Sequence, residues 1–176
     1  MKKPEAYKSD LCPPLINYIK NVASSEQTKI LHFGVCKNKI EDELLKYKDY
    51  MSLDIYDNNT LPDINKKYNH IICHRVLHTT ADYDRYLQKI SEALLPGGSL
   101  FVSARSTNCQ EYTRRNKYIQ NNILDNDYKY IKFFTNNEIN QLLTGAGFTV
   151  IEDGTFTEIS RFARKENSYN YVIAVK

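Results

Sequence analysis

Apolar and polar residues alternate along the chain in blocks whose lengths suit short strands and helices. Runs rich in apolar, β-branched or aromatic residues predict strands at Lys29–Phe33, Tyr50–Tyr56, His70–Cys73, Ser99–Val102, Phe148–Ile151 and Tyr169–Val175. Helical spacing of apolar residues predicts helices at Leu15–Ser24, Ile40–Tyr47, Asp82–Leu95 and from Asn136 to Thr144. Strands that alternate with helices predict an α/β sandwich built on a mostly parallel sheet.

The middle of the chain gives the clearest pattern. The strand His70–Cys73 leads through a polar loop into the helix Asp82–Leu95, and the run Leu95-Pro96-Gly97-Gly98 then turns the chain into the strand Ser99–Val102. This is a β-α-β unit, the building block of a parallel sheet. Asp57–Lys67 upstream is polar and predicts a loop.

The second half of the chain adds three expectations. Thr135 and Glu138 have the spacing of a capping box at a helix start. The last two predicted strands are joined by a stretch without helical pattern, which predicts an antiparallel pair. The segment 105–130 is polar and rich in Asn, Tyr and Arg, and it predicts a helix or two that form either a lid over a site or a solvated surface.

Composition sets the class of protein. The 176 residues suffice for one domain, 1–176, with residues 1–28 as an N-terminal helical segment. The net charge of +3 is spread along the chain without a block, which speaks against nucleic-acid binding. The four cysteines have irregular spacing, so free thiols are expected, with neither a zinc nor a redox motif. No signal peptide and no long apolar run appear, so we expect a soluble cytoplasmic protein that binds no membrane.

Three stretches together resemble the class I S-adenosylmethionine-dependent methyltransferases, in particular those that act on small molecules. They are KILHFGVCKNK with YMSLDIY, then YNHIICHRVLHTTADYDRYLQKISEALLPGGSLFVS, then FFTNNEINQLLTGAGFTVIE with YNYVIAV. The resemblance implies a Rossmann-like three-layer sandwich, mostly parallel, with a C-terminal antiparallel strand pair. The middle of the sheet is expected to be shorter than in that family, because only a short polar stretch separates Asp54 from Tyr68. The resemblance also implies S-adenosylmethionine as the cofactor.

The loop after the first strand departs from that family's pattern. The family has an acidic residue and a G-x-G-x-G loop here, where glycines let the backbone approach the cofactor closely. In this chain His32 occupies the position of the acidic residue. Gly34 matches the first glycine of the loop, and Cys36 and Asn38 occupy the positions of the second and third glycines. Two interpretations remain: a variant loop, with His32, Gly34 and Cys36 still at the cofactor, or a loop that no longer binds it.

The next strand holds the candidate for the cofactor's ribose. Asp54 lies twenty positions after Gly34, where the family has an acidic residue that accepts hydrogen bonds from both ribose hydroxyls. The alternative is an aspartate that caps a turn. Ile55 and Asp57 are the accompanying cofactor-binding candidates. The family usually has a further helix and a third strand before Tyr68, so either that strand is missing or Asp54 belongs to it.

Two histidines follow the strand His70–Cys73, at the edge of the sheet where α/β folds bind ligands. His74 is a candidate for contact with the cofactor and for catalysis, and His78 is a candidate for a general base or for orienting the substrate. The alternative for both is a solvated loop histidine or a polar residue that precedes a helix. A metal site is not expected from this strand-and-loop pattern.

Two functions therefore stand side by side. The first is S-adenosylmethionine-dependent methyl transfer to a small-molecule acceptor. The second is an inactive methyltransferase-like domain that binds a protein partner or acts as a regulatory subunit, which the lost glycines and the missing acid favour. A nicotinamide-dependent Rossmann protein is disfavoured because no G-x-G-x-x-G follows a strand.

Overall fold

The structure is a computed structural model of the whole chain. It describes residues 12–23, 28–33, 51–56, 66–109, 112, 121–126, 129–159 and 166–176, and of residues 51–56, 124–126, 129, 159 and 166 it describes the backbone alone. The predicted helix Ile40–Tyr47 lies outside these residues.

A mixed sheet of six strands forms the centre of the molecule, in the order β2-β1-β3-β4-β8-β7. Its strands in chain order are β1 (Thr28–Phe33), β2 (Met51–Tyr56), β3 (Tyr68–His74), β4 (Leu94–Arg105), β7 (Thr149–Ile159) and β8 (Glu166–Val175). The first four pair in parallel, while β8 is antiparallel to both β4 and β7. The predicted sheet and the C-terminal antiparallel pair are thus confirmed.

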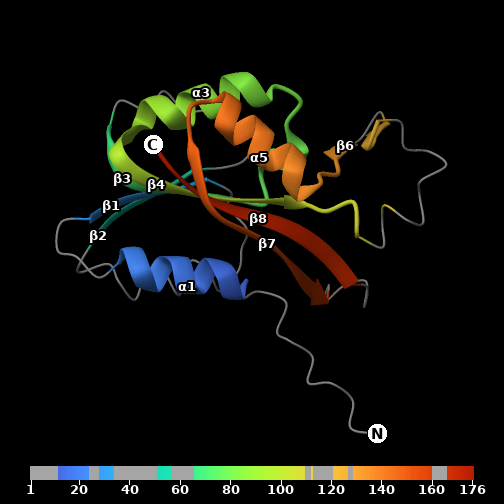
Figure 1. Cartoon of the computed structure of the whole chain (residues 1–176), viewed down its shortest axis with the longest axis horizontal. Helices are drawn as coiled ribbons and strands as arrows, with labels where there is room; N and C mark the ends of the chain where they lie inside the picture. Colours follow the sequence, from blue (N-terminus) through green and yellow to red (C-terminus); the bar gives the residue numbers. More distant parts are fainter. Residues whose placement is uncertain are drawn as a thin grey trace, which may run out of the picture.

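Helices cover both faces of the sheet (Figure 1). One face carries α1 (Pro13–Val22), which starts with the two prolines that a first helical turn tolerates. The other face carries α3 (Tyr83–Ala93) and α5 (Asn136–Gly145). Each face has its own core of buried apolar side chains, so β3 and β4 are buried on both sides, as parallel strands usually are.

Local signals in the sequence account for the ends of both helices on that second face. The side chain of Asp82 accepts a hydrogen bond from the backbone of Arg85 at the start of α3. Thr135 and Glu138 form the predicted capping box at the start of α5. Because capping satisfies backbone N–H groups that have no partner within the helix, both starts are fixed by the residues beside them.

The Pro-Gly-Gly run is a bulge inside β4. Tyr68 pairs with Leu94 and His70 with Ser99, so residues 95–98 loop out between two stretches of the same ladder. Gly97 has a φ of 74°, which favours glycine. Gly98 lies so close to its neighbours that a Cβ would meet the backbone oxygen of Asn69 at 2.7 Å. The two glycines therefore serve different purposes, one a backbone angle and the other a close approach.

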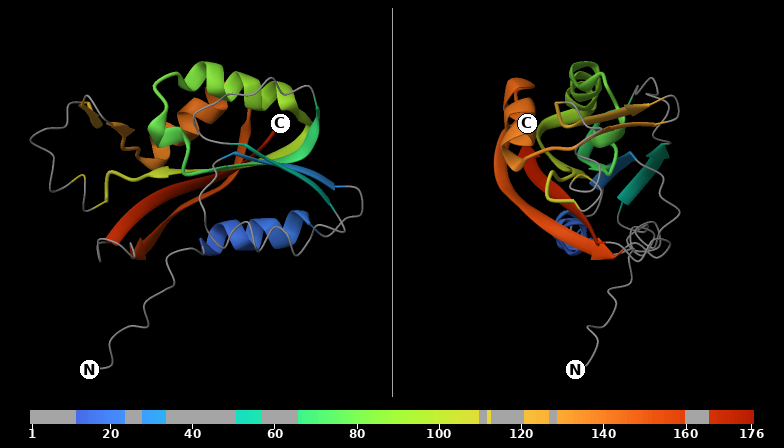
Figure 2. Two further views of the ribbon diagram at one scale, coloured as in Figure 1. Left: turned by 180° about the vertical axis from the view of Figure 1, so that it is seen from behind. Right: turned by 90° about the vertical axis from the view of Figure 1, so that its right-hand side faces the viewer.

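The two C-terminal strands are longer than the sequence pattern predicts. They pair from Thr149–Val175 to Ile159–Glu166, three residue pairs beyond Tyr169, which is the last residue of β8 that pairs with β4. Figure 2 shows this extension curving away from the sheet as an arm. We call residues 154–159 and 166–171 the β7–β8 arm. It brings residues from the end of the chain to the edge at which β3 and β4 finish.

The structure corrects the expectation for the segment 105–130 and decides which strand holds Asp54. The segment 105–130 is not simply helical, because β5 (Ile123–Asn126) begins within it and pairs with β6 (Lys129–Lys132). Asp54 lies in the second strand and not in a displaced third one, since β2 pairs directly with β1. Among the described residues no strand continues the sheet beyond β2. No helix within the described ranges is long and apolar enough to cross a membrane.

Candidate functional site

The carboxyl ends of β1, β3 and β4 meet at one edge of the sheet, where Phe33, His74 and Arg105 are the last strand residues. Figure 1 shows β4 ending on the same side of the sheet as the outer ends of β7 and β8. Open α/β sheets bind ligands outside the carboxyl ends of their strands. The polar side chains gathered here therefore form the candidate site.

Arg75 follows β3 in an unusual backbone conformation. Its φ of 60° is in the left-handed region that side-chain-bearing residues rarely adopt. The Arg75 N–H donates to the backbone oxygen of Ser103 at 3.0 Å and to its Oγ at 3.1 Å. Strain of this kind persists where neighbouring contacts fix the backbone, and it concentrates at functional sites.

The side chain of Arg75 pairs with Glu158 of the β7–β8 arm, with side-chain exposures of 14% and 10%. Its guanidinium also lies 4.9 Å from the centre of the Tyr169 ring. Burial raises the pKa of Glu158, although the Arg75 charge acts in the opposite direction. The arm thus contributes a carboxylate and an aromatic surface to the edge.

His74 is fully buried beside this pair. Its Nδ1 is 2.8 Å from the Oγ of Ser103, and its ring stacks on Phe156 at a centroid distance of 6.4 Å. Burial lowers the pKa of His74 well below 6.5, and the charges of Arg75 and the other two nearby histidines act in the same direction. The Nε2 of His74 has no hydrogen-bond partner in the described part of the chain. His74 is therefore a neutral imidazole with one ring nitrogen committed to Ser103.

His78 lies in the short 3-10 helix η1 (Leu77–Thr79) and is only 6% exposed, so it is not a solvated loop residue. Its ring meets Tyr169 edge-on at 6.2 Å. Phe156 and Tyr169 stack on each other at 5.3 Å, so His74 and His78 contact the same aromatic pair. The structure brings the two predicted histidines together through the arm.

His32 lies on the same face of the sheet, one strand away. It pairs in register with Ile72 of β3 and with Ile55 of β2. The side chain is 1% exposed, and within the described residues neither ring nitrogen has a hydrogen-bond partner. Burial lowers the pKa of His32 to about 4, so its ring is neutral near pH 7.

The backbone register also places Asp54 beside Leu31, so Asp54 and Ile55 flank the end of β1. Gly34, Cys36 and Asp57 lie outside the described residues. The predicted role of each of these residues stays a prediction.

Three contributors to the site were not singled out from the sequence: Ser103, Glu158 and Tyr169. Ser103 was detectable, because the two-residue period of β4 sets it on the same face as Phe101. Glu158 and Tyr169 carried no local signal, since they reach Arg75 from more than 80 positions away. Nowhere in the described ranges do His, Cys, Asp and Glu side chains gather as a metal site would require.

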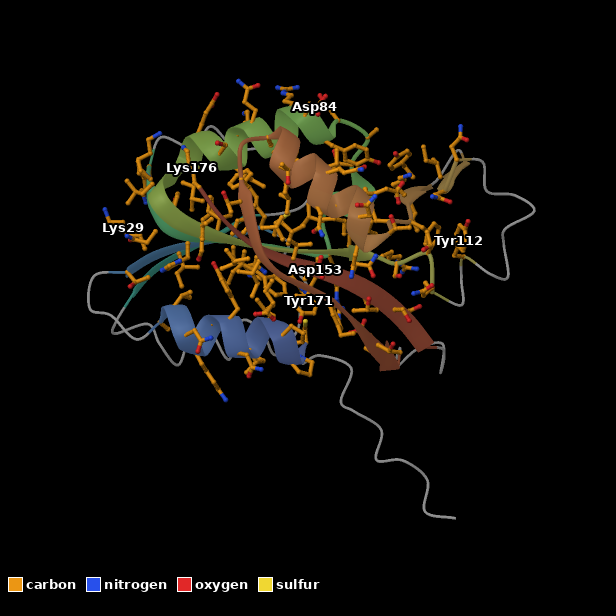
Figure 3. All side chains as sticks on the ribbon, in the orientation of Figure 1. Lys29, Asp84, Tyr112, Asp153, Tyr171 and Lys176 are labelled. Carbon is orange, nitrogen blue, oxygen red and sulfur yellow. The ribbon has the colours of Figure 1, made fainter. Side chains whose placement is uncertain are left out.

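A second hollow lies away from this edge, between α3 and α5. It has a volume of about 760 Å³, with Phe134 and Leu142 among its apolar lining and Asp84, Glu92 and Glu138 among its acidic lining. Figure 3 shows Asp84 on the outer side of α3. None of the strand-end residues described above lines it, so the candidate site and this hollow are separate.

The sequence was compared with known families and structures. Residues 4–153 match a family described as methyltransferase domain. The chain belongs to this family. No curated protein sequence matches it.

Solved structures with the same fold are distant in sequence. An S-adenosylmethionine-dependent methyltransferase from Methanosarcina mazei has a TM-score of 0.68 at 16% identity, over 95% of this chain and 98% of the other. The 1,6-didemethyltoxoflavin-N1-methyltransferase of Burkholderia thailandensis, solved with that substrate and S-adenosylhomocysteine, has a TM-score of 0.63 at 14% identity, over 93% and 77%. A chain in the complex of the Haloferax volcanii Trm112 methyltransferase activator with a methyltransferase has a TM-score of 0.60 at 13% identity, over 92% and 87%.

These comparisons confirm the predicted methyltransferase family and its Rossmann-like fold, and they support S-adenosylmethionine as the cofactor. In this methyltransferase domain the candidate site is the edge at which His32, His74 and Arg75 meet. S-adenosylmethionine has polar groups, and the ring nitrogens of His32 and His74 that have no partner among the described residues are chemically able to form hydrogen bonds with such groups.

Proposed function

We propose that the protein transfers a methyl group from S-adenosylmethionine to a small-molecule acceptor at the carboxyl edge of its sheet. The family match over residues 4–153 supports methyl transfer. The location of the active site is supported by one observation. Three polar side chains that are buried or mostly buried cluster at the ends of β1 and β3, namely His32, His74 and Arg75. A structural relative with a bound small-molecule substrate supports the acceptor class.

When bound, S-adenosylmethionine supplies an electrophilic methyl group on a sulfonium. Asp54 is proposed to accept hydrogen bonds from the ribose, with Ile55 and Asp57 beside it. The backbone around Gly34 and Cys36 is proposed to pass close to the methionine part. Methyl transfer depends mainly on alignment of the reacting atoms, so the chain's residues act chiefly by positioning.

The histidines would act on the acceptor side. Tyr169 fixes the edge of the His78 ring, which favours a residue that orients an acceptor or takes its proton. His74 is held by Ser103 and Phe156 and is proposed to contact a bound ligand. The β7–β8 arm closes this side through Glu158 and its pair with Arg75.

Calorimetry with S-adenosylmethionine and S-adenosylhomocysteine tests the proposal. We expect micromolar binding that is lost in Asp54→Ala and kept in Asp84→Ala, a matched change of an exposed aspartate on α3. Transfer of a labelled methyl group to a panel of amines, thiols, phenols and carboxylates then identifies the acceptor. No heat at millimolar cofactor would sink the proposal.

The second candidate, a domain that binds a protein partner without catalysis, is favoured by one observation. His32 is neutral and buried at the position where the family has an acid. A structural relative in complex with a protein activator shows that this fold is compatible with such a partner. Absence of cofactor binding, with the fold intact by circular dichroism, would favour this candidate.

A further inference from the structure

The hydrogen bonds around Ser103 fix the tautomer of His74. The hydroxyl of Ser103 is fully buried, and its oxygen accepts from the backbone N–H of Arg75 at 3.1 Å. The same oxygen lies 2.8 Å from Nδ1 of His74. A serine hydroxyl has one proton to donate and two lone pairs to accept with.

The two possible assignments differ in how many groups they leave without a partner among the described residues. A proton on Nδ1 leaves both the Ser103 O–H and the lone pair of Nε2 unpaired, whereas a proton on Nε2 leaves only that N–H unpaired. If His74 carried its proton on Nδ1, that N–H would donate to Ser103, and the buried Ser103 hydroxyl proton would have no recipient among the described side chains. If Ser103 donates to Nδ1 instead, its proton and its lone pair are both used. The proton of neutral His74 then resides on Nε2.

The Nε2–H of His74 is therefore a buried donor that finds no acceptor within the described part of the chain. A buried donor without a partner costs folding free energy, so each such group calls for an explanation, and a bound ligand is one. His32, an electrostatic neighbour of His74 on the same face, adds two more ring nitrogens without partners. Two independent side chains thus indicate that a polar ligand atom belongs here.

We infer that His74 donates its Nε2–H to an oxygen atom of a bound small molecule, and that Ser103 is the positioning residue that holds His74 in this tautomer. The inference has two parts: the tautomer of His74, which we call the tautomer half, and the hydrogen bond from Nε2–H to a ligand oxygen, which we call the ligand half. The ligand half rests on the proposed function and deepens it. It gives His74 the role of a fixed hydrogen-bond donor instead of a base. The oxygen belongs either to the cofactor or to the methyl acceptor, and both are open to test.

The tautomer is measured without any ligand. Long-range ¹H–¹⁵N spectra of protein with ¹⁵N-labelled histidine distinguish a protonated Nδ1 from a protonated Nε2, and His74→Gln assigns the signal. We expect Nε2–H in the wild type, a mixture of tautomers in Ser103→Ala, and Nε2–H again in Ser103→Thr, which keeps the hydroxyl. A proton on Nδ1 in the wild type overturns the inference, and so does an unchanged tautomer in Ser103→Ala. The wild-type spectrum decides even if a variant does not fold.

The ligand half uses two probes on the same sample. A downfield shift of the His74 Nε2–H on addition of S-adenosylhomocysteine assigns the oxygen to the cofactor. A shift that appears only when benzoate or phenol follows saturating S-adenosylhomocysteine assigns it to the acceptor. In either case Ser103→Ala is expected to weaken binding of that probe about 5-fold, the effect of one lost hydrogen bond.

Calorimetry on this sample separates the two possible failures. If S-adenosylhomocysteine binds but neither probe moves the Nε2–H signal, the ligand half is wrong and the proposed function stands. If S-adenosylhomocysteine does not bind, the proposed function fails and the ligand half fails with it. The tautomer half is decided by the ligand-free spectra in both cases.

Discussion

Burial of His32 as a neutral ring makes the stability of the protein fall in mild acid. The folded-state pKa of His32 is about 4 because of burial, whereas an unfolded chain has an ordinary histidine pKa of 6.5. Below pH 6.5 the unfolded state binds a proton that the folded state does not, so unfolding becomes more favourable as the pH falls. The contribution is complete above pH 6.5 and is lost down to the folded pKa.

The size of the effect follows from the pKa difference. One histidine in this situation changes the free energy of unfolding by about 1.4 kcal/mol per pH unit. Across the interval from 6.5 to about 4, His32 therefore accounts for roughly 3 kcal/mol. His74 adds to the loss in the same direction, because burial also lowers its pKa. Losses of this size are a large fraction of the stability of a single domain.

Urea unfolding between pH 7.5 and 4.5 measures this dependence. We expect His32→Leu to flatten the profile below pH 6.5 by about 1.4 kcal/mol per unit relative to the wild type. Ile30→Val is the matched control, since Ile30 is buried on the same face of β1 and does not titrate. It should lower stability by about 1 kcal/mol at every pH. Parallel profiles for wild type and His32→Leu would refute the argument and indicate that the folded protein binds the proton.

Three further changes have expected outcomes that urea unfolding at pH 7 can measure. Glu158→Gln leaves the mostly buried guanidinium of Arg75 without its counter-charge and should cost roughly 3 kcal/mol, and a loss below 0.5 would contradict this. Thr135→Ala removes the capping box of α5 and should cost about 1 kcal/mol, whereas an unchanged midpoint would show that the cap contributes nothing. Gly98→Ala places a Cβ 2.7 and 2.8 Å from two backbone oxygens and should lower the free energy of unfolding by roughly 2 kcal/mol. Gly145→Ala is the control, because its Cβ meets nothing within 4 Å and the change should be neutral or slightly stabilising. Equal effects of the two changes would be inconsistent with the close approach at Gly98.

The fold was predictable because its signals are local. Apolar runs mark β1, β3 and β4, the Thr135–Glu138 spacing marks the start of α5, and the structure has each of these where the sequence predicts it. The β5–β6 pair was missed because its strands are four residues each and lack an apolar alternation. The extra length of β7 was missed for a related reason. After Ile151 the strand continues through Glu152, Asp153 and Gly154, which are not typical strand residues.

Only the part of the candidate site that directly follows or ends β3 was predictable from the sequence. His74 and His78 were found because they follow a recognisable strand, at the end where ligands bind. Their neighbours Glu158 and Tyr169 come from the β7–β8 arm, and no sequence pattern states how far an arm extends or where it curves. A prediction of such long-range contacts requires the register of β7 with β8, which the structure supplies.

The distribution of unfavourable features across the sheet supports a binding site at its carboxyl edge. A left-handed Arg75 and buried imidazoles at His32 and His74 each oppose folding, and all three lie at this edge. The remainder of β3 and β4 is buried between two apolar cores, which fix the backbone firmly enough to hold these features in place. An aliphatic residue at position 32 would remove the cost of burying unpaired ring nitrogens, and Ile30, which lies two positions before it on the same face of β1, is such a residue. The ring nitrogens of His32 and His74 lie close together beside an apolar core. This arrangement is expected if they bind a ligand that the folded protein recognises and the unfolded chain does not.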